Sequence, residues 1–269
     1  MFDAVFDLPL VVVGIAILIL LCVFALSGLA IFSRHILPRL KLGPEESVFT
    51  SAMMQAVMVF YGLAVALIAV SVWQTHTDAA QTTSREATAL GVLYRQVTGY
   101  PEPVRSQLQQ LLREYVDYVI QEAWPQQRHG QVPSGGVGKV NDFEAKLVTF
   151  EPATEGQKIL HGETLRAYSQ MIEARRLRLD AVLTGLPGVL WFVIVIGALV
   201  SLGSTFFFQV EDARLQRIQV VVLAIFIGLI IFIIFALDRP FRGDLGLQPD
   251  PYQLIYDQLM KPCPELYSR

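Results

Sequence analysis

Charged side chains that flank long apolar runs are the residues of this chain best placed to act on an ion. They are Asp78, Glu86, Arg175, Arg176, Arg178, Asp238 and Arg239. At 1.5 Å per residue, Glu86 lies about 20 Å beyond the apolar run that ends at Trp73, and Arg176 lies about 17 Å before Pro187. On two antiparallel helices, Glu86 and Arg176 would therefore face each other. Such pairs either form a charged ring at the vestibule of a pore or hold two helices in register as structural ion pairs.

Hydrolytic and metal chemistry is not indicated. The four histidines are His35, His76, His129 and His161. None has a partner at zinc-ligand spacing. The two cysteines, Cys22 and Cys263, stand far apart, so we expect neither a disulfide nor a zinc site. We predict no catalytic residue, no cofactor, no metal and no enzymatic activity.

The segment Ser134-Gly-Gly-Val-Gly-Lys139 has some of the composition of a phosphate-binding loop but not its pattern. Pro133 stands where the first glycine belongs, and Val140 replaces the Ser or Thr that binds magnesium. We therefore interpret residues 126–141 as an ordinary loop.

Four uncharged apolar runs must position the charged residues. They cover residues 8–32, 52–73, 188–208 and 218–237. Each is long enough to cross the hydrocarbon core of a bilayer, and together they explain why 53% of the chain is hydrophobic and only 17% is charged. The first run is too long for a signal peptide, and the residues before it include Asp3 and Asp7 but no Lys or Arg. The predicted fold is an all-α integral membrane protein with four transmembrane helices.

Residues 74–187 are predicted to form a helical extramembrane domain between the second and third spans. The helix of the second span continues to Gly99 as an amphipathic helix, because apolar residues recur there at spacings of three and four. Further helices are expected over 101–124, 142–149 and 151–186, so that the second and third spans both extend out of the bilayer. In this division, 1–51 is the first span with a short loop, 188–237 is a helical hairpin, and 238–269 is a tail with a short docking helix after Pro249.

The spans contain no Asp, Glu, Lys, Arg or His. Pumps, ion-coupled transporters and voltage sensors usually carry such residues in the membrane, so this absence argues against those classes. It does not argue against a channel, because apolar residues can line and gate a pore. The formal charge of −3 gives no basic surface for nucleic acid.

Several motifs resemble those of the bestrophin-like family of bacterial membrane proteins. They are Phe60-Tyr61-Gly62 through Val72-Trp73, Glu86-Ala87 with Leu90, Leu93, Tyr94 and Arg95, Glu122 with Trp124-Pro125, Arg175 with Arg178-Leu179, Pro187 and Trp191, and Asp238-Arg239-Pro240-Phe241 with Gly243. Bestrophins are pentameric anion channels with a cytoplasmic helical domain and a pore lined by the second membrane helix. They carry a Pro-Phe-Gly element after the last span, which Arg242 interrupts here. No acidic calcium-binding run is present, so the resemblance does not extend to calcium activation.

The resemblance implies a homo-oligomeric chloride channel in which Phe60, Leu63 and Leu67, together with Gln55, turn toward the pore. Packing of these residues within one subunit is the alternative. The partners are then the lipid bilayer, further copies of the chain and an inorganic anion, but no nucleic acid. The resemblance, rather than the distribution of Lys and Arg, places the protein in the inner membrane with its termini and helical domain in the cytoplasm. A stator-like protein, or a membrane-anchored scaffold or sensor that acts through a protein partner, is the competing hypothesis.

Overall fold

The computed structural model describes residues 8–36, 44–207 and 212–261. Within these residues the chain is helical and contains no strand. It divides into two compact units. The membrane unit comprises residues 1–74 and 185–238, and the polar unit comprises residues 75–184 and 239–269. The all-α fold predicted from the sequence is confirmed.

Among its described residues, the membrane unit contains four helices that are long and apolar enough to cross a bilayer. They are α1 (Leu10–Ile31), the first half of α2 (Pro44–Val97), α7 (Gly188–Ser204) and α8 (Ala213–Leu237). A π-helical turn (Phe32–Ile36) follows α1, and a 3₁₀ turn (Thr205–Phe207) follows α7. The four predicted spans are thus confirmed.

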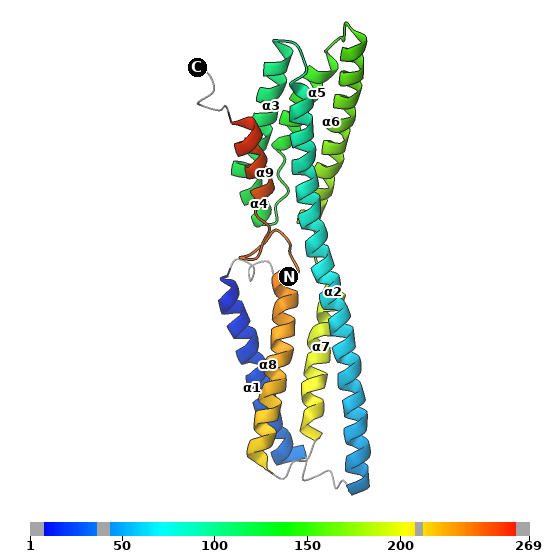
Figure 1. Cartoon of the computed structure of the whole chain (residues 1–269). Helices are drawn as coiled ribbons and strands as arrows, with labels where there is room; N and C mark the ends of the chain where they lie inside the picture. The colour runs from blue at the N-terminus through cyan, green and yellow to red at the C-terminus, as the bar shows by residue number, and fades with distance from the viewer. Residues whose placement is uncertain (1–7, 37–43, 208–211, 262–269) are drawn as a thin grey trace. The chain divides into compact units, whose positions relative to one another are not determined.

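Small residues allow α1 and α8 to run side by side (Figure 1). Ala25 and Ala224 are completely buried, and a Cβ on Gly228 would lie 2.7 Å from the Leu18 side chain. Helices in a membrane approach closely where their contact surfaces lack large side chains, because packing rather than water exclusion drives their association. Apolar residues of α7, including Ile194 and Leu202, complete this core.

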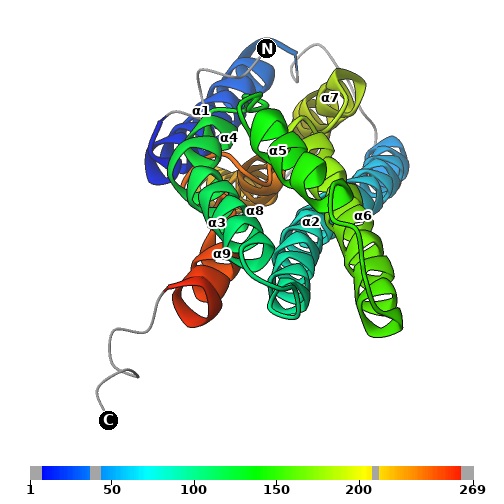
Figure 2. The same ribbon diagram turned by 90° about the horizontal axis from the view of Figure 1, so that it is seen from above.

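The polar unit contains the second half of α2 and a set of shorter helices. They are α3 (Val104–Tyr118), α4 (Trp124–Arg128), α5 (Gly136–Val148), α6 (Glu155–Val182) and α9 (Asp250–Ile255), with π-helical turns at Val119–Ala123 and Tyr256–Met260. Figure 2 shows these helices end-on, and α3 packs against α5. Leu90, Leu93, Leu108 and Leu147 are completely buried in the core of this unit. Burying each such side chain stabilises the fold by about 1.5–3 kcal/mol.

Several predicted boundaries were wrong for local reasons. The predicted loop over 126–141 is partly helical, since α4 continues to Arg128 and α5 already begins at Gly136. The helix predicted over 151–186 is α6, which begins only at Glu155 because the Thr154 side chain accepts a hydrogen bond from Gln157 N at 3.2 Å and caps it. It ends at Val182, so α6 and α7 are separate helices. Proline disfavours a helical conformation in the preceding residue, so Pro187 keeps Leu186 out of α7.

The fourth span also differs from its predicted start. Helix α8 begins at Ala213, five residues before the predicted position, because the Asp212 side chain accepts a hydrogen bond from Arg214 N at 2.7 Å. Arg214 and Arg217 therefore belong to the first turns of α8 rather than to a turn between helices. The beginning of the polar segment 209–217 lies outside the described residues.

Candidate functional site

One face of the membrane segment of α2 is not covered by the rest of its own chain. Phe60, Leu63 and Leu67 are 71%, 59% and 64% exposed, whereas Val65 and Val72 are buried. At 100° per residue, the three exposed side chains lie within about 60° of one another, and Val65 lies about 140° from Phe60. The structure therefore places three of the predicted pore residues together on one face, and they do not pack within the subunit.

Gln55 is also exposed but does not share that face. Five positions separate it from Phe60, which corresponds to an angle of about 140° around the helix. Met53 and Val70, which are 52% and 54% exposed, continue the apolar stripe instead. The seven-residue spacing of Met53 from Phe60, and of Leu63 from Val70, is the sequence signal that could have identified them.

The opposite face of α2 packs on α7. The Tyr61 hydroxyl donates a hydrogen bond to the carbonyl oxygen of Ile194 at 2.9 Å. A Cβ on Gly197 would lie 2.4 Å from the Tyr61 ring, so glycine is required for this close approach. These contacts determine which face of α2 is left exposed.

Glu86 and Arg178 form a buried ion pair between α2 and α6 in the polar unit. Arg178 Nε donates to Glu86 Oε2 at 2.6 Å, and Arg178 Nη2 donates to Glu86 Oε1 at 3.3 Å. The Tyr115 hydroxyl of α3 donates to the same Oε1 atom at 2.7 Å. Glu86 and Arg178 are 0% and 1% exposed. Three helices thus converge on one carboxylate.

Aromatic residues enclose the Arg178 guanidinium. Its Cζ lies 5.7 Å from the ring centroid of Tyr252 and 5.9 Å from that of Trp124, as in cation–π contacts. The Trp124 indole donates to the carbonyl oxygen of Leu247 at 3.0 Å and so ties α4 to the tail. Tyr115 and Tyr252 were not predicted as members of this cluster, because no sequence pattern relates positions so far apart.

The cluster strongly favours a neutral tyrosine beside a charged pair. Burial raises the pKa of Tyr115, and the negative charge of Glu86 raises it further. Burial also raises the pKa of Tyr252 well above its ordinary value. Burial by itself lowers the pKa of Arg178, but the Glu86 carboxylate together with Tyr252 and Tyr115 outweighs this effect, and the net shift is upward. Arg178 therefore remains charged and Tyr115 remains a hydrogen-bond donor.

The other predicted charges do not gather around Glu86. Asp78 and Arg176 are exposed, and Arg175 is half-buried. The predicted pairing of Glu86 with Arg176 was wrong, since Arg178 occupies that place. Two residues correspond to a rotation of about 200°, so only one of the two arginines can face α2.

Asp238 bonds a backbone group just before α7, and Arg239 bonds one just after α6. Within the membrane unit, Asp238 Oδ1 accepts a hydrogen bond from Leu186 N at 2.5 Å. Within the polar unit, Arg239 Nη1 donates to the carbonyl oxygen of Leu183 at 3.1 Å. Each of these adjacent residues thus bonds a backbone group within its own unit.

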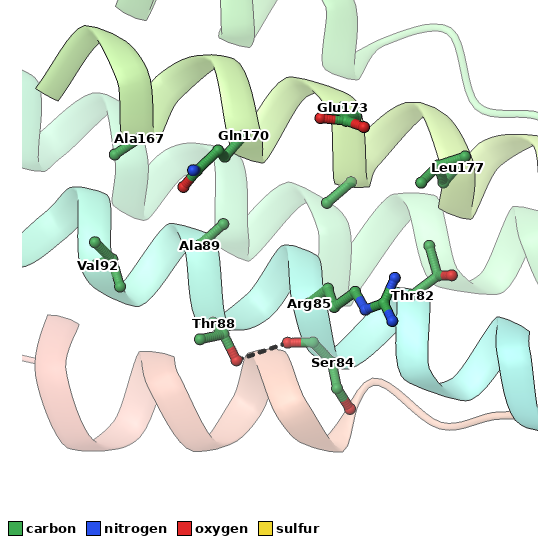
Figure 3. A pocket seen from close by; sticks show the side chains of 11 residues that line it. Thr82, Ser84, Arg85, Thr88, Ala89, Val92, Ala167, Gln170, Glu173 and Leu177 are labelled. Atoms are coloured by element: carbon green, nitrogen blue, oxygen red, sulfur yellow. Dashed lines mark hydrogen bonds between the residues drawn. The ribbon is translucent and has the colours of Figure 1, made fainter. Parts of the chain in front are cut away.

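A groove of about 490 Å³ lies between α2 and α6 in the polar unit (Figure 3). Small residues, including Ala89, Ala167 and Ala174, line it together with Arg85 and Glu173. Both charged side chains are exposed. The groove contains no histidine or cysteine, and no group of three or more His, Cys, Asp or Glu side chains in the described part of the chain could hold a metal ion.

Comparisons with known proteins identify the fold and the family. No curated protein matches the chain. A crystal structure of a bacterial bestrophin homologue variant from Klebsiella pneumoniae has a TM-score of 0.70 at 10% identity, over 91% of this chain and 98% of that chain. A second variant of that homologue has a TM-score of 0.65 at 12% identity, again over 91% and 98%. A structure described only as a membrane protein variant has a TM-score of 0.70 at 10% identity, over 91% and 97%. The family model of the Bestrophin-like domain matches residues 19–252, and the chain therefore belongs to the Bestrophin-like family.

Proposed function

We propose that this protein is a homo-oligomeric, anion-conducting channel in which α2 of each copy lines a common pore. The observation that carries the proposal is the exposed stripe of Phe60, Leu63 and Leu67 on the span of α2. Cyclic symmetry would bring copies of this stripe around one axis. By analogy with the family, we propose five copies.

The burial of the four spans supports α2 as the helix at the interface between copies. Only 11% of its apolar window is buried within the chain, against 22% for α1, 39% for α7 and 44% for α8. Gln55 is also exposed on this span, and a polar amide is costly against lipid. Neighbouring subunits or an aqueous path would remove that cost.

The chemistry of the stripe favours anions over cations. Cation channels commonly select with rings of Asp or Glu, and the span of α2 contains no acidic side chain. A constriction formed by aromatic and aliphatic side chains gates by dewetting. Large, weakly hydrated anions lose less hydration free energy there than small cations do.

The test combines mass measurement with ion flux. The purified protein is placed in nanodiscs to determine its mass and symmetry, and in liposomes to measure chloride flux. We expect a ring of identical chains, flux that increases in Phe60→Ala and flux that decreases in Phe60→Trp. Phe226, which is 61% exposed on α8, provides the matched control, since Phe226→Ala and Phe226→Trp should leave flux unchanged.

A monomer or dimer without flux would contradict the channel proposal. If a second membrane protein copurified in fixed stoichiometry, the scaffold or stator hypothesis would explain the protein better.

The orientation is part of the proposal, with the polar unit and both termini in the cytoplasm. In a Cys22→Ala, Cys263→Ala background, Ala153→Cys should resist an impermeant thiol reagent added outside intact cells, whereas Pro44→Cys should react. Ala153 is exposed on the surface of the polar unit, so lack of labelling there would reflect orientation rather than burial. The reverse pattern would place the polar unit outside.

A further inference from the structure

The membrane unit contains a crevice of about 490 Å³ between α1, α7 and α8, and every side chain that lines it is apolar. Its floor is formed by residues that the chain itself buries, namely Val13, Leu21 and Ala198. Its mouth is formed by exposed residues such as Leu20 and Val195, which are 70% and 44% exposed. The crevice is therefore recessed into the unit and open along one side.

The ends of the crevice can be placed along the spans by counting residues. Val13 is in the first turn of α1, Trp191 is in the first turn of α7, and Phe235 is in the last turn of α8, so one end lies where these helices enter the bilayer. Phe24 is eleven residues beyond Val13 on α1, and Leu199 is eight beyond Trp191 on α7, which corresponds to a crevice length of about 12–17 Å. That length is about half of a hydrocarbon core of roughly 30 Å, so the crevice extends over about one leaflet.

The lining defines the chemistry of the occupant. A cavity lined only by apolar side chains does not hold water. Trp191 and Phe235 pack edge to face at the entrance, with ring centroids 6.2 Å apart. An indole at this level is suited to the boundary between headgroups and acyl chains. At this depth, the molecule in contact with the mouth is the bilayer lipid.

We propose that this crevice binds one acyl chain of a phospholipid from the leaflet at the N-terminal end of α7. Lipid tails are as apolar as leucine side chains, so transfer from the bilayer provides little driving force. Selectivity comes instead from the fit of one chain against the recessed floor, where it gains dispersion contacts on several sides. The proposal depends on the membrane unit spanning a bilayer and not on ion conduction.

Fluorescence quenching of Trp191 tests the proposal. In a Trp73→Phe background, the remaining tryptophans are Trp191 and Trp124, and Trp124 is buried in the core of the polar unit. The protein is placed in nanodiscs of dioleoylphosphatidylcholine that contain increasing fractions of the same lipid brominated along its acyl chains. Because the brominated and plain lipids compete for one site, we expect the quenching of Trp191 to rise in proportion to the bromolipid fraction, and we expect the purified protein to retain phospholipid in native mass spectrometry.

Two variants fill the crevice by independent routes. Ala198→Leu adds volume at the floor and Val195→Phe adds it at the mouth, so each should at least halve the quenching of Trp191 and remove the retained phospholipid. Ala16→Leu is the matched control, because Ala16 is exposed on α1 outside the crevice. It should behave like the parent protein.

Three outcomes would overturn the proposal. Quenching that levels off at low bromolipid fractions, as several equivalent surface lipids would produce, or that is equal in all variants, would show ordinary surface lipid. Absence of quenching in an oligomer would show that a second copy of the chain covers the crevice. Retained phospholipid that persists in both filling variants would place the lipid elsewhere. None of these outcomes depends on chloride flux, so failure here is distinguishable from failure of the proposed channel.

Discussion

Arg178 Nε lies 2.6 Å from Glu86 Oε2, although 92 positions separate the two residues in the sequence. Both side chains are buried, and together they join α2 to α6. A buried ion pair contributes little net stability relative to a well-packed apolar pair, but an unpaired buried charge is very costly. The pair therefore specifies how these helices align, and the effects on stability of removing its two members should not be additive.

Breaking the pair from either side should destabilise the polar unit strongly. We expect Glu86→Gln and Arg178→Met each to lower the free energy of unfolding by about 3–5 kcal/mol, because each leaves the partner without its main interaction. The double variant should cost less than the sum. The measurement is denaturant unfolding of the solubilised protein followed by circular dichroism.

The control for these single and double variants is Arg176→Met. Arg176 is exposed two residues before Arg178, and we expect its replacement to change stability by about 0.5 kcal/mol or less. Additive costs in the double variant would contradict the coupling inferred from the geometry.

Alkaline pH should weaken the same cluster. Burial raises the pKa of Tyr115 and Tyr252 above the ordinary tyrosine value of 10.0. A group whose pKa is raised in the folded state contributes its full stability below the unfolded pKa and loses it as the pH rises toward the folded pKa. We therefore expect the midpoint of thermal unfolding to fall above about pH 10.

Removing one of these hydroxyls should reduce the alkaline loss. Tyr252→Phe should show a shallower fall in the unfolding midpoint above pH 10 than the parent protein, whereas Tyr256→Phe, at a less buried position of the same segment, should follow the parent. Identical slopes for the parent and Tyr252→Phe would show that ionisation of Tyr252 does not oppose folding.

The contact between α2 and α7 should be sensitive to one methyl group. Gly197→Ala would place a Cβ 2.4 Å from the Tyr61 ring, whose hydroxyl is held by the Ile194 carbonyl. We expect a cost of about 1–3 kcal/mol from overpacking, measured as a lower midpoint of thermal unfolding. Gly203→Ala in the same helix meets no atom within 4 Å and should be tolerated. Equal stability of the two variants would contradict this account.

The tail should depend on Phe241. This side chain is buried against Trp124, with ring centroids 5.5 Å apart. Phe241→Ala should destabilise the docked tail by about 3–5 kcal/mol, as large-to-small changes in a core do. Limited proteolysis should then cleave after residue 238 at lower protease concentrations. Leu245→Ala, at an exposed position four residues later, should leave the cleavage pattern unchanged.

The sequence by itself determined the four spans, because an uncharged run of sufficient length has few stable locations outside a bilayer. It also determined the continuity of α2 through Trp73, since neither Pro nor Gly interrupts the helical pattern between Gln74 and Leu90. The grouping of Phe60, Leu63 and Leu67 followed from helix periodicity, which is a local property. The sequence motifs were sufficient to indicate the Bestrophin-like family.

Only the tertiary structure decided which charged residues meet. Arg176 and Arg178 are the same residue type and lie only two positions apart. The orientation of α6 about its axis turns Arg178 toward Glu86. The starts of α6 and α8 depended instead on local caps, Thr154 to Gln157 N and Asp212 to Arg214 N, which apolar periodicity does not report. The side of α2 that remains exposed depended on where Tyr61 packs against α7, and the crevice of the membrane unit depended on how three apolar helices leave space between them. The ion pair, the exposed face of α2 and the crevice each result from side chains far apart in the sequence coming into contact, and no local pattern encodes such contacts.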